Sequence, residues 1–226
     1  MKKILAILLL AALALSFAAC GQEKVPAPEA APAAETAAPE SGSTEPDTSA
    51  AEAETPETTP ERPKVLVAYF SQTGNTRPLA ERAAELLGAD LYEITPEQPY
   101  TGPDINYNDP DSRSTREQTD PTARPAIAGG VENMEQYSVV VLAYPIWWGL
   151  APRIVDTFLE SYDFAGKTLV PFCTSASSGV GRSVEELKEL CDGSALWAEG
   201  KRFPAQGLEE LERWLREVPE LSGLVS

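Results

Sequence analysis

Residues 64–87 read KVLVAYFSQTGNTRPLAERAAELL, and three segments of different physical character follow one another in this stretch. Residues 64–70 form a nearly continuous apolar run with two β-branched valines, which predicts a strand buried on both faces, as in a parallel sheet. Residues 77–87 repeat alanine and leucine at helical spacing, with Pro78 in the first turn and Gly88 directly after the last leucine. The stretch therefore predicts a buried strand, a polar loop and a helix in direct succession.

The polar loop carries groups that suit a phosphate. A helix N-terminus presents free backbone N–H groups and a partial positive charge, so a phosphate can bind there without a lysine. No Gly-Lys-Ser/Thr ends the loop and no G-x-G-x-x-G is present, which disfavours a nucleoside triphosphate and a dinucleotide. A solvated turn that carries hydroxyls by chance is the plain alternative. The candidate phosphate-binding residues are Ser71, Thr73, Gly74, Asn75 and Thr76.

An aromatic loop follows another predicted buried strand, residues 137–143. Its sequence, Tyr144-Pro-Ile-Trp-Trp-Gly149, places two tryptophans side by side. Because the carboxyl ends of parallel strands meet at one edge of a sheet, we expect this loop beside the phosphate loop. Adjacent indoles cannot face the same way, so one is expected to stack on a flat ligand and the other to pack inward, with purely structural packing as the alternative. The candidate binding residues here are Pro145, Ile146, Trp147, Trp148 and Gly149.

A third loop opens after the predicted strand of residues 167–173. It offers hydroxyls, small residues and backbone amides, and it is expected at the same edge of the sheet as the other two loops. These groups suit the polar edge of a ligand. The candidate binding residues are Thr174, Ser175, Ser177, Ser178 and Gly179.

The three loops together carry a resemblance to a known family. The pattern Ser/Thr-x-Thr-Gly-x-Thr in residues 71–76 is similar to the loop of flavodoxins that holds the phosphate of FMN, and the Trp-Gly pair resembles their ring-flanking loop. The resemblance implies FMN as the cofactor and one Trp stacked on its isoalloxazine ring. Flavodoxins usually carry an aromatic residue in the third loop. This chain does not, so Tyr100 or Tyr107 is expected to cover the second face of the ring.

The alternation of strands and helices predicts an α/β domain over residues 63–226. We expect a three-layer, doubly wound, five-stranded parallel sheet with the flavodoxin-like strand order 2-1-3-4-5, its second and fifth strands at residues 89–95 and 195–198. Six prolines interrupt residues 96–126, where only residues 112–119 predict a short helix. This segment is interpreted as a long structured loop over the ligand site, and the alternative is a solvated surface excursion.

The N-terminus predicts export. Residues 1–19 combine a basic start, an uncharged apolar segment and small residues, which is typical of a signal peptide. Phe17-Ala18-Ala19-Cys20 resembles a bacterial lipobox, so we expect a lipoprotein anchored to the membrane through Cys20 on the extracytoplasmic side. An ordinary secreted protein cut near Ala19 is the alternative. Residues 20–62 hold seven prolines and no aromatic residue, which predicts a disordered, lipid-anchored linker.

Composition narrows the possible chemistry. The formal charge is −17 for the chain and −11 for residues 63–226, which disfavours nucleic acid as a partner. The chain has no histidine, which removes the commonest metal ligand and general base, and no metal site is predicted. Apart from Cys20, its cysteines are Cys173 and Cys191, which are interpreted as small buried residues and not as a disulfide.

Three functional hypotheses follow from the resemblance. The first is a lipid-anchored FMN protein that transfers electrons at the membrane surface, with a redox partner protein or a small electron acceptor as its partner. The second is an NAD(P)H-dependent flavin or quinone reductase of the same fold, because Tyr-Pro-Ile-Trp-Trp-Gly followed by Ala-Pro-Arg is similar to the loop of such enzymes. Arg113, Arg116 and Arg124 are the candidates for a nicotinamide-phosphate clamp. The third is a binding module without a cofactor.

Overall fold

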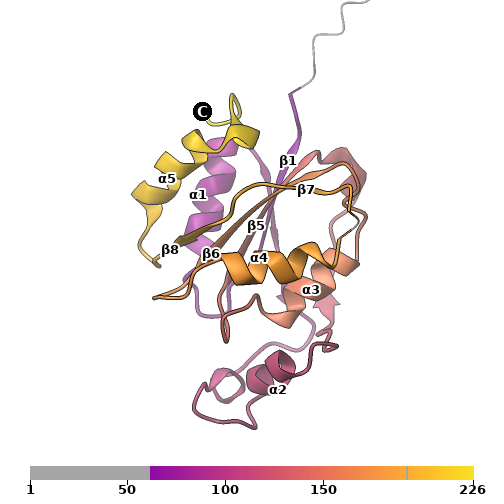
Figure 1. Cartoon of the computed structure of the whole chain (residues 1–226), viewed down its shortest axis with the longest axis vertical. Helices are drawn as coiled ribbons and strands as arrows, with labels where there is room; N and C mark the ends of the chain where they lie inside the picture. Colours follow the sequence, from indigo (N-terminus) through magenta and orange to yellow (C-terminus); the bar gives the residue numbers. More distant parts are fainter. Residues whose placement is uncertain (1–61, 192) are drawn as a thin grey trace, which may run out of the picture. The chain divides into compact units, whose positions relative to one another are not determined.

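The computed structural model describes residues 62–191 and 193–226, and a parallel sheet forms the centre of this part (Figure 1). The neighbouring strands run in the order β2-β1-β5-β6, and β7 and β8 both pair with β6 on its far side. The predicted signal peptide, Cys20 and the linker lie outside the described residues. The strands of this sheet are β1 (Val65–Tyr69), β2 (Asp90–Glu93), β5 (Val139–Pro145), β6 (Thr168–Thr174), β7 (Leu196–Trp197) and β8 (Lys201–Phe203).

Helices cover both faces of the sheet, which confirms the predicted three-layer α/β fold. Residues 65, 67 and 69 of β1 pack in one apolar cluster with α1 and α5, and residues 66 and 68 pack in a second cluster with α3 and α4. Figure 1 shows α1 beside α5 on one side of the sheet, with α3 and α4 on the other. The helices are α1 (Arg77–Leu87), α2 (Arg113–Thr119), α3 (Arg153–Glu160), α4 (Gly181–Lys188) and α5 (Leu208–Glu217), with short 3₁₀ turns η1 (Pro103–Ile105), η2 (Met134–Gln136) and η3 (Pro219–Leu221).

Helix α1 begins and ends where its sequence predicts. Pro78 lies in the first turn, where no intrahelical N–H is required. Gly88 adopts a left-handed conformation with φ 58°, and the following N–H, of Ala89, donates to Ala84 O at 2.9 Å. This pattern satisfies the last carbonyls of the helix and ends it, since other L residues are disfavoured at that φ.

The last strand position is divided between β7 and β8, whereas one strand at residues 195–198 was predicted. On the β7 and β8 side of β6, the carbonyl of Leu169 accepts a backbone hydrogen bond at 2.9 Å. On the same side, the N–H of Ser175 donates a backbone hydrogen bond at 3.1 Å. Backbone groups of a strand alternate between its two neighbours, so Pro171 also faces this side, and it has no N–H to donate. The pairing is therefore interrupted at Pro171, and the chain resumes it as β8, where Lys201 lies opposite Phe172.

The segment between β2 and β5 folds as a structured excursion. A two-stranded antiparallel pair, β3 (Thr95–Pro96) and β4 (Ile127–Ala128), closes its base, and this pair is not predicted by the sequence pattern. The predicted short helix is present as α2, with the Ser112 side chain accepting from the N–H of Thr115 at its N-terminus. Figure 1 shows α2 beyond the end of the sheet. Hydrogen bonds from Gln72 and Gln118 join the excursion to the loops after β1 and β5.

Candidate functional site

The three predicted loops meet at the carboxyl ends of β1, β5 and β6 and line one cavity of about 660 Å³. Ten of the predicted residues line it: Thr73, Asn75, Pro145, Ile146, Trp147, Trp148, Gly149, Thr174, Ser175 and Ser178. Five others lie in the same loops without lining it: Ser71, Gly74, Thr76, Ser177 and Gly179. A cavity of this size, open at a sheet edge, suits a ligand of drug or cofactor size.

The loop after β1 presents donors at the N-terminus of α1. The backbone N–H groups of Thr73, Gly74 and Asn75 have no hydrogen-bond acceptor among the residues that the structure describes. Gly74 has φ 78°, a conformation that favours glycine and that turns successive N–H groups outward. The Ser71 hydroxyl acts differently, because it accepts the N–H groups of Thr76 and Arg77 at 3.2 and 3.1 Å. The loop thus offers an anion free N–H groups and the exposed side chains of Thr73 and Asn75.

Thr76 is directed at the neighbouring loop. Thr76 is 1% exposed, and its Oγ1 lies 2.8 Å from Oγ1 of Thr174 at the end of β6. This hydrogen bond joins the phosphate loop to the third loop beneath the cavity. An anion bound at the loop after β1 would accept a hydrogen bond from the Thr76 hydroxyl only if that hydroxyl gave up its hydrogen bond to Thr174.

The two tryptophans separate as the sequence predicts. Trp147 packs inward and is only 4% exposed. Its ring makes edge contacts with Phe70 and Tyr100 at centroid distances of 5.5 and 5.3 Å. Trp148 is half-buried at the cavity and lies 4.5 Å from the ring of Tyr107, with the two planes at 32°. Trp148 is therefore the indole available to a flat ligand.

Trp148 lies in a tight turn with an unfavourable backbone. Trp147 and Leu150 exchange backbone hydrogen bonds at 2.9 and 3.0 Å, which closes a turn with Trp148 and Gly149 at its centre. The φ angles of these two are 50° and 84°, as a type I′ turn requires. Asn-Gly is the usual pair at such positions, and a bulky aromatic residue at positive φ costs about 1–3 kcal/mol. The chain keeps an indole at a position that energetically favours asparagine.

The two candidate tyrosines of the excursion have different roles. Tyr100 is buried against Phe70 and Trp147, its hydroxyl donates to Glu117, and burial raises its pKa. It does not line the cavity, so its expected contact with the ligand ring is absent here. Tyr107 is 56% exposed and lines the cavity together with Ile105 of η1. The excursion therefore forms part of the cavity wall, and its aromatic member there, Tyr107, lies against the ring of Trp148.

A fourth wall was not predicted. Pro204, Ala205 and Gln206, in the loop after β8, also line the cavity. The N–H of Ser175 donates to Phe203 O at 3.1 Å, and Arg202 Nη1 donates to Ser175 O at 3.1 Å, so β8 holds the third loop in place. Because the predicted last strand ends at residue 198, the sequence pattern does not place this loop at the sheet edge.

The arginines considered for a nicotinamide clamp are engaged elsewhere. Arg113 pairs with Glu117 at 2.6 Å and lies 4.0 Å above the Tyr100 ring, and Arg116 donates to the carbonyl of Asp111. Arg124 pairs with Glu160 of α3 at 2.6 Å. None of these three arginines is among the described residues that line the cavity.

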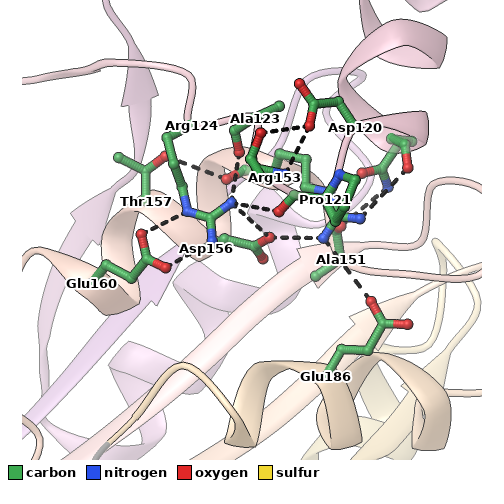
Figure 2. Close-up of polar contacts among 12 residues, drawn as sticks. Asp120, Pro121, Ala123, Arg124, Ala151, Arg153, Asp156, Thr157, Glu160 and Glu186 are labelled. Carbon is green, nitrogen blue, oxygen red and sulfur yellow. Dashed lines mark hydrogen bonds and ion pairs between the residues drawn. The ribbon is translucent and has the colours of Figure 1, made fainter. Parts of the chain in front are cut away.

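Arg153 lies in a separate buried ion pair next to the aromatic loop. Figure 2 shows Asp156 between Arg153 and Arg124, with Nη1 atoms 2.9 and 3.8 Å from its Oδ2. Arg153 is 9% exposed and Asp156 is 3% exposed. Burial raises the pKa of Asp156, and the two guanidinium groups offset only part of that effect. Arg153 thus serves the packing of α3 and is neutralised by Asp156.

Three further features bear on the earlier expectations. Cys173 is buried and Cys191 is half-buried, both as free thiols, and burial raises their pKa values to about 12 and about 11. Within residues 62–191 and 193–226, no group of three or more His, Cys, Asp or Glu side chains could hold a metal ion. In the same part of the chain, no helix has the length and apolar character to span a membrane.

The fold and the three convergent loops define a doubly wound α/β protein with a ligand site at the carboxyl edge of its sheet. The family model described as "Flavodoxin" matches residues 64–218, and the chain therefore belongs to the flavodoxin family. No curated protein matches the chain.

Solved structures agree with this assignment. A protein classed as a flavoprotein from Bacteroides eggerthii DSM 20697 is 44% identical, with a TM-score of 0.65, and the match covers 70% of this chain and 98% of that one. Another, from Bacteroides uniformis ATCC 8492, is 40% identical, with a TM-score of 0.65 and coverage of 68% and 98%. A flavoprotein from Lactobacillus acidophilus NCFM, crystallised in complex with FMN, shares the fold at 20% identity, with a TM-score of 0.52 and coverage of 68% and 99%.

Proposed function

We propose that this flavodoxin-family protein binds FMN in the cavity between the three loops and transfers electrons at the surface of a membrane. One observation carries the proposal: Thr73 and Asn75, whose backbone N–H groups have no partner among the described residues, and the ring of Trp148 line one cavity of about 660 Å³. Phosphate suits the first group and a flat aromatic ring suits the second. FMN contains both, and when bound it supplies one- and two-electron redox chemistry.

Each wall of the cavity has a task in this proposal. The N–H groups of residues 73–75 and the side chains of Thr73 and Asn75 hold the phosphate dianion at the N-terminus of α1. Trp148 packs against the ring and excludes water from one face of it. Ser175 and Ser178 present hydroxyl and backbone donors to the polar edge of the ring.

A titration of the apo domain tests cofactor binding. FMN and riboflavin are added separately, and binding is followed by the quenching of flavin fluorescence. We expect one FMN per chain and at least tenfold weaker binding of riboflavin, since riboflavin lacks the phosphate that the loop after β1 is built to hold. Equal affinities for the two would remove the phosphate cradle from the proposal, and no binding of either would remove FMN.

The proposal favours a carrier over a reductase because the arginines of the excursion are already paired and do not line the cavity. A nicotinamide phosphate would therefore meet no cluster of free cations there. The reductase is the second candidate, supported by the similarity of residues 144–153 to the loop of flavodoxin-like reductases. Stopped-flow mixing of the FMN-loaded protein with NADH and NADPH separates the two. A carrier is reduced slowly by both, and fast reduction by either identifies a reductase.

The location at a membrane is proposed from the sequence of residues 1–20. Export, cleavage before Cys20 and lipid modification of that cysteine would tether the domain by residues 21–62 on the extracytoplasmic side. A redox partner protein or a small electron acceptor would then be met there. Mass spectrometry of the mature protein tests this, together with a Cys20→Ser form. An unlipidated N-terminus, or Cys20→Ser protein that still fractionates with membranes, would contradict it.

A further inference from the structure

We infer that Gln118, on helix α2 of the excursion, is a positioning residue that holds the turn at Trp147–Leu150 in its strained form and thereby orients the Trp148 ring toward the cavity. The inference rests on the proposed function for its consequence, which is binding of the flavin ring. The contacts that carry it are present without any ligand.

The first observation is a pair of hydrogen bonds that span the turn. Gln118 Nε2 donates to the carbonyl of Trp147 at 2.8 Å and to the carbonyl of Ala151 at 3.1 Å. Only a donor can satisfy two carbonyls, so the amide nitrogen, and not Oε1, faces the turn. The Trp147 carbonyl also accepts the N–H of Leu150, so both of its lone pairs are used. The direction of the peptide group that precedes Trp148 is therefore fixed from two sides.

The second observation is that the turn needs such support. Trp148 has φ 50°, which is a costly conformation for an aromatic residue and persists only where surrounding contacts determine it. The tilted ring contact between Trp148 and Tyr107 acts on the side chain and does not restrain the backbone. Gln118 acts on the backbone on both sides of the strained residue.

The third observation is that Gln118 itself has little freedom. The residue is 8% exposed, and Arg153 Nη2 donates to its backbone carbonyl at 3.5 Å, so the end of α2 is tied to the start of α3. Its Oε1 is buried without a hydrogen-bond partner among the described residues. A buried acceptor without a partner is unfavourable, which indicates that the amide is retained for its donor side. Gln118 thus links helix α2, which is distant in the sequence, to the turn at Trp147–Leu150, whose conformation decides where Trp148 lies.

The test uses the apo protein and four variants. Gln118→Met keeps the volume and removes the amide donor. Thr119→Ala is the matched control, because Thr119 is exposed and its hydroxyl donates only to carbonyls of α2. Trp148→Asn relaxes the turn, since asparagine tolerates positive φ. The fourth variant combines Gln118→Met with Trp148→Asn. Far-UV circular dichroism first shows that each is folded. If Gln118→Met does not fold, Gln118→Asn replaces it, because its shorter amide cannot reach both carbonyls.

The main measurement is amide hydrogen exchange at Leu150, whose N–H closes the turn. We expect Gln118→Met to lower its protection about tenfold, the size expected for one or two lost hydrogen bonds. Thr119→Ala should leave it unchanged. In the Trp148→Asn background the same Gln118→Met change should lower protection less than about threefold, since the relaxed turn needs no external support. Equal protection in wild type and Gln118→Met, or an undiminished loss in the Trp148→Asn background, would overturn the inference.

A second measurement connects the turn to the ligand. We expect Gln118→Met to weaken FMN and riboflavin by the same factor, about tenfold, because the ring and not the phosphate loses its support. A loss confined to FMN would overturn the inference, since it would place the effect at the phosphate loop. If wild-type protein binds neither flavin, the proposed function fails, and the exchange result still decides the role of Gln118.

Discussion

The hydroxyl pair of Thr76 and Thr174 allows folding and cofactor binding to be separated by one set of variants. Both residues are buried, and their Oγ1 atoms are 2.8 Å apart. Thr76→Val or Thr174→Val alone leaves one buried hydroxyl without its partner, which costs about 1–3 kcal/mol in the free energy of unfolding. The double valine variant removes both polar groups and keeps the shape, so we expect its stability to lie within about 1 kcal/mol of wild type.

Affinity for FMN should not recover in the same way. The sequence predicts that the Thr76 hydroxyl also serves the FMN phosphate. With the bond seen in the structure, this requires the hydroxyl to exchange Thr174 for a charged acceptor. A charge-assisted hydrogen bond contributes about 1.5–3 kcal/mol, so Thr76→Val should weaken FMN roughly ten- to hundredfold. The double variant should show the same loss although its stability is restored.

Urea unfolding of the apo protein measures the first effect, and fluorescence titration measures the second. The ratio of FMN to riboflavin affinity is the decisive quantity, because riboflavin reports any change at the ring without the phosphate. If the double variant keeps the wild-type ratio, the Thr76 hydroxyl serves only to join the two loops. The phosphate would then be held by Thr73, Asn75 and the backbone alone.

Two further predictions concern buried titratable groups. Arg153→Met leaves Asp156 buried with less compensation, so we expect destabilisation by about 3 kcal/mol at pH 8 in urea unfolding. Because the folded-state pKa of Asp156 is raised, protonation of Asp156 favours the folded state. The loss of stability caused by Arg153→Met should therefore shrink as the pH falls and grow as the pH rises through that pKa. A loss of stability independent of pH would contradict this. The raised pKa values of Cys173 and Cys191, about 12 and about 11, predict that neither reacts appreciably with iodoacetamide at pH 8 in native protein. The unprocessed chain should therefore show one fast thiol, Cys20, and the lipid-modified form should show none.

Local sequence signals predicted most of the fold. The bounds of α1 followed from Pro78 and Gly88, because helix starts and stops depend on a few neighbouring residues. Buried strands followed from short apolar runs, and their order follows the doubly wound pattern. The division of the last strand was missed because it depends on which way Pro171 faces, and that is fixed only once β6 lies between its neighbours.

The site was predicted only as far as its loops. The sequence placed Trp147 and Trp148 at the sheet edge but could not say which indole faces the cavity, because that depends on the bridge between Trp147 and Leu150. Gln118 was missed for a similar reason. Gln118 lies 29 residues from Trp147 in the chain, inside a segment that prolines interrupt. No local sequence pattern pairs the two residues.

The charges around the cavity change what the acidic composition implies for flavin reduction. A net charge of −11 on residues 63–226 disfavours a more negative, reduced cofactor, but salt screens exposed charges over a Debye length of about 8 Å. Arg153, which could have offset them, is neutralised by Asp156. Arg202 donates to the carbonyl of Ser175 in the cavity wall and forms no ion pair among the described residues. A unit charge acting over about 10 Å at an effective dielectric constant of about 20 is worth about 1.7 kcal/mol, or about 35 mV for a two-electron couple. Because Arg202 is half-buried, salt screens it less than the exposed carboxylates. A midpoint potential that Arg202 sets would therefore vary little with salt, whereas one set by the surface acids would rise as salt is added.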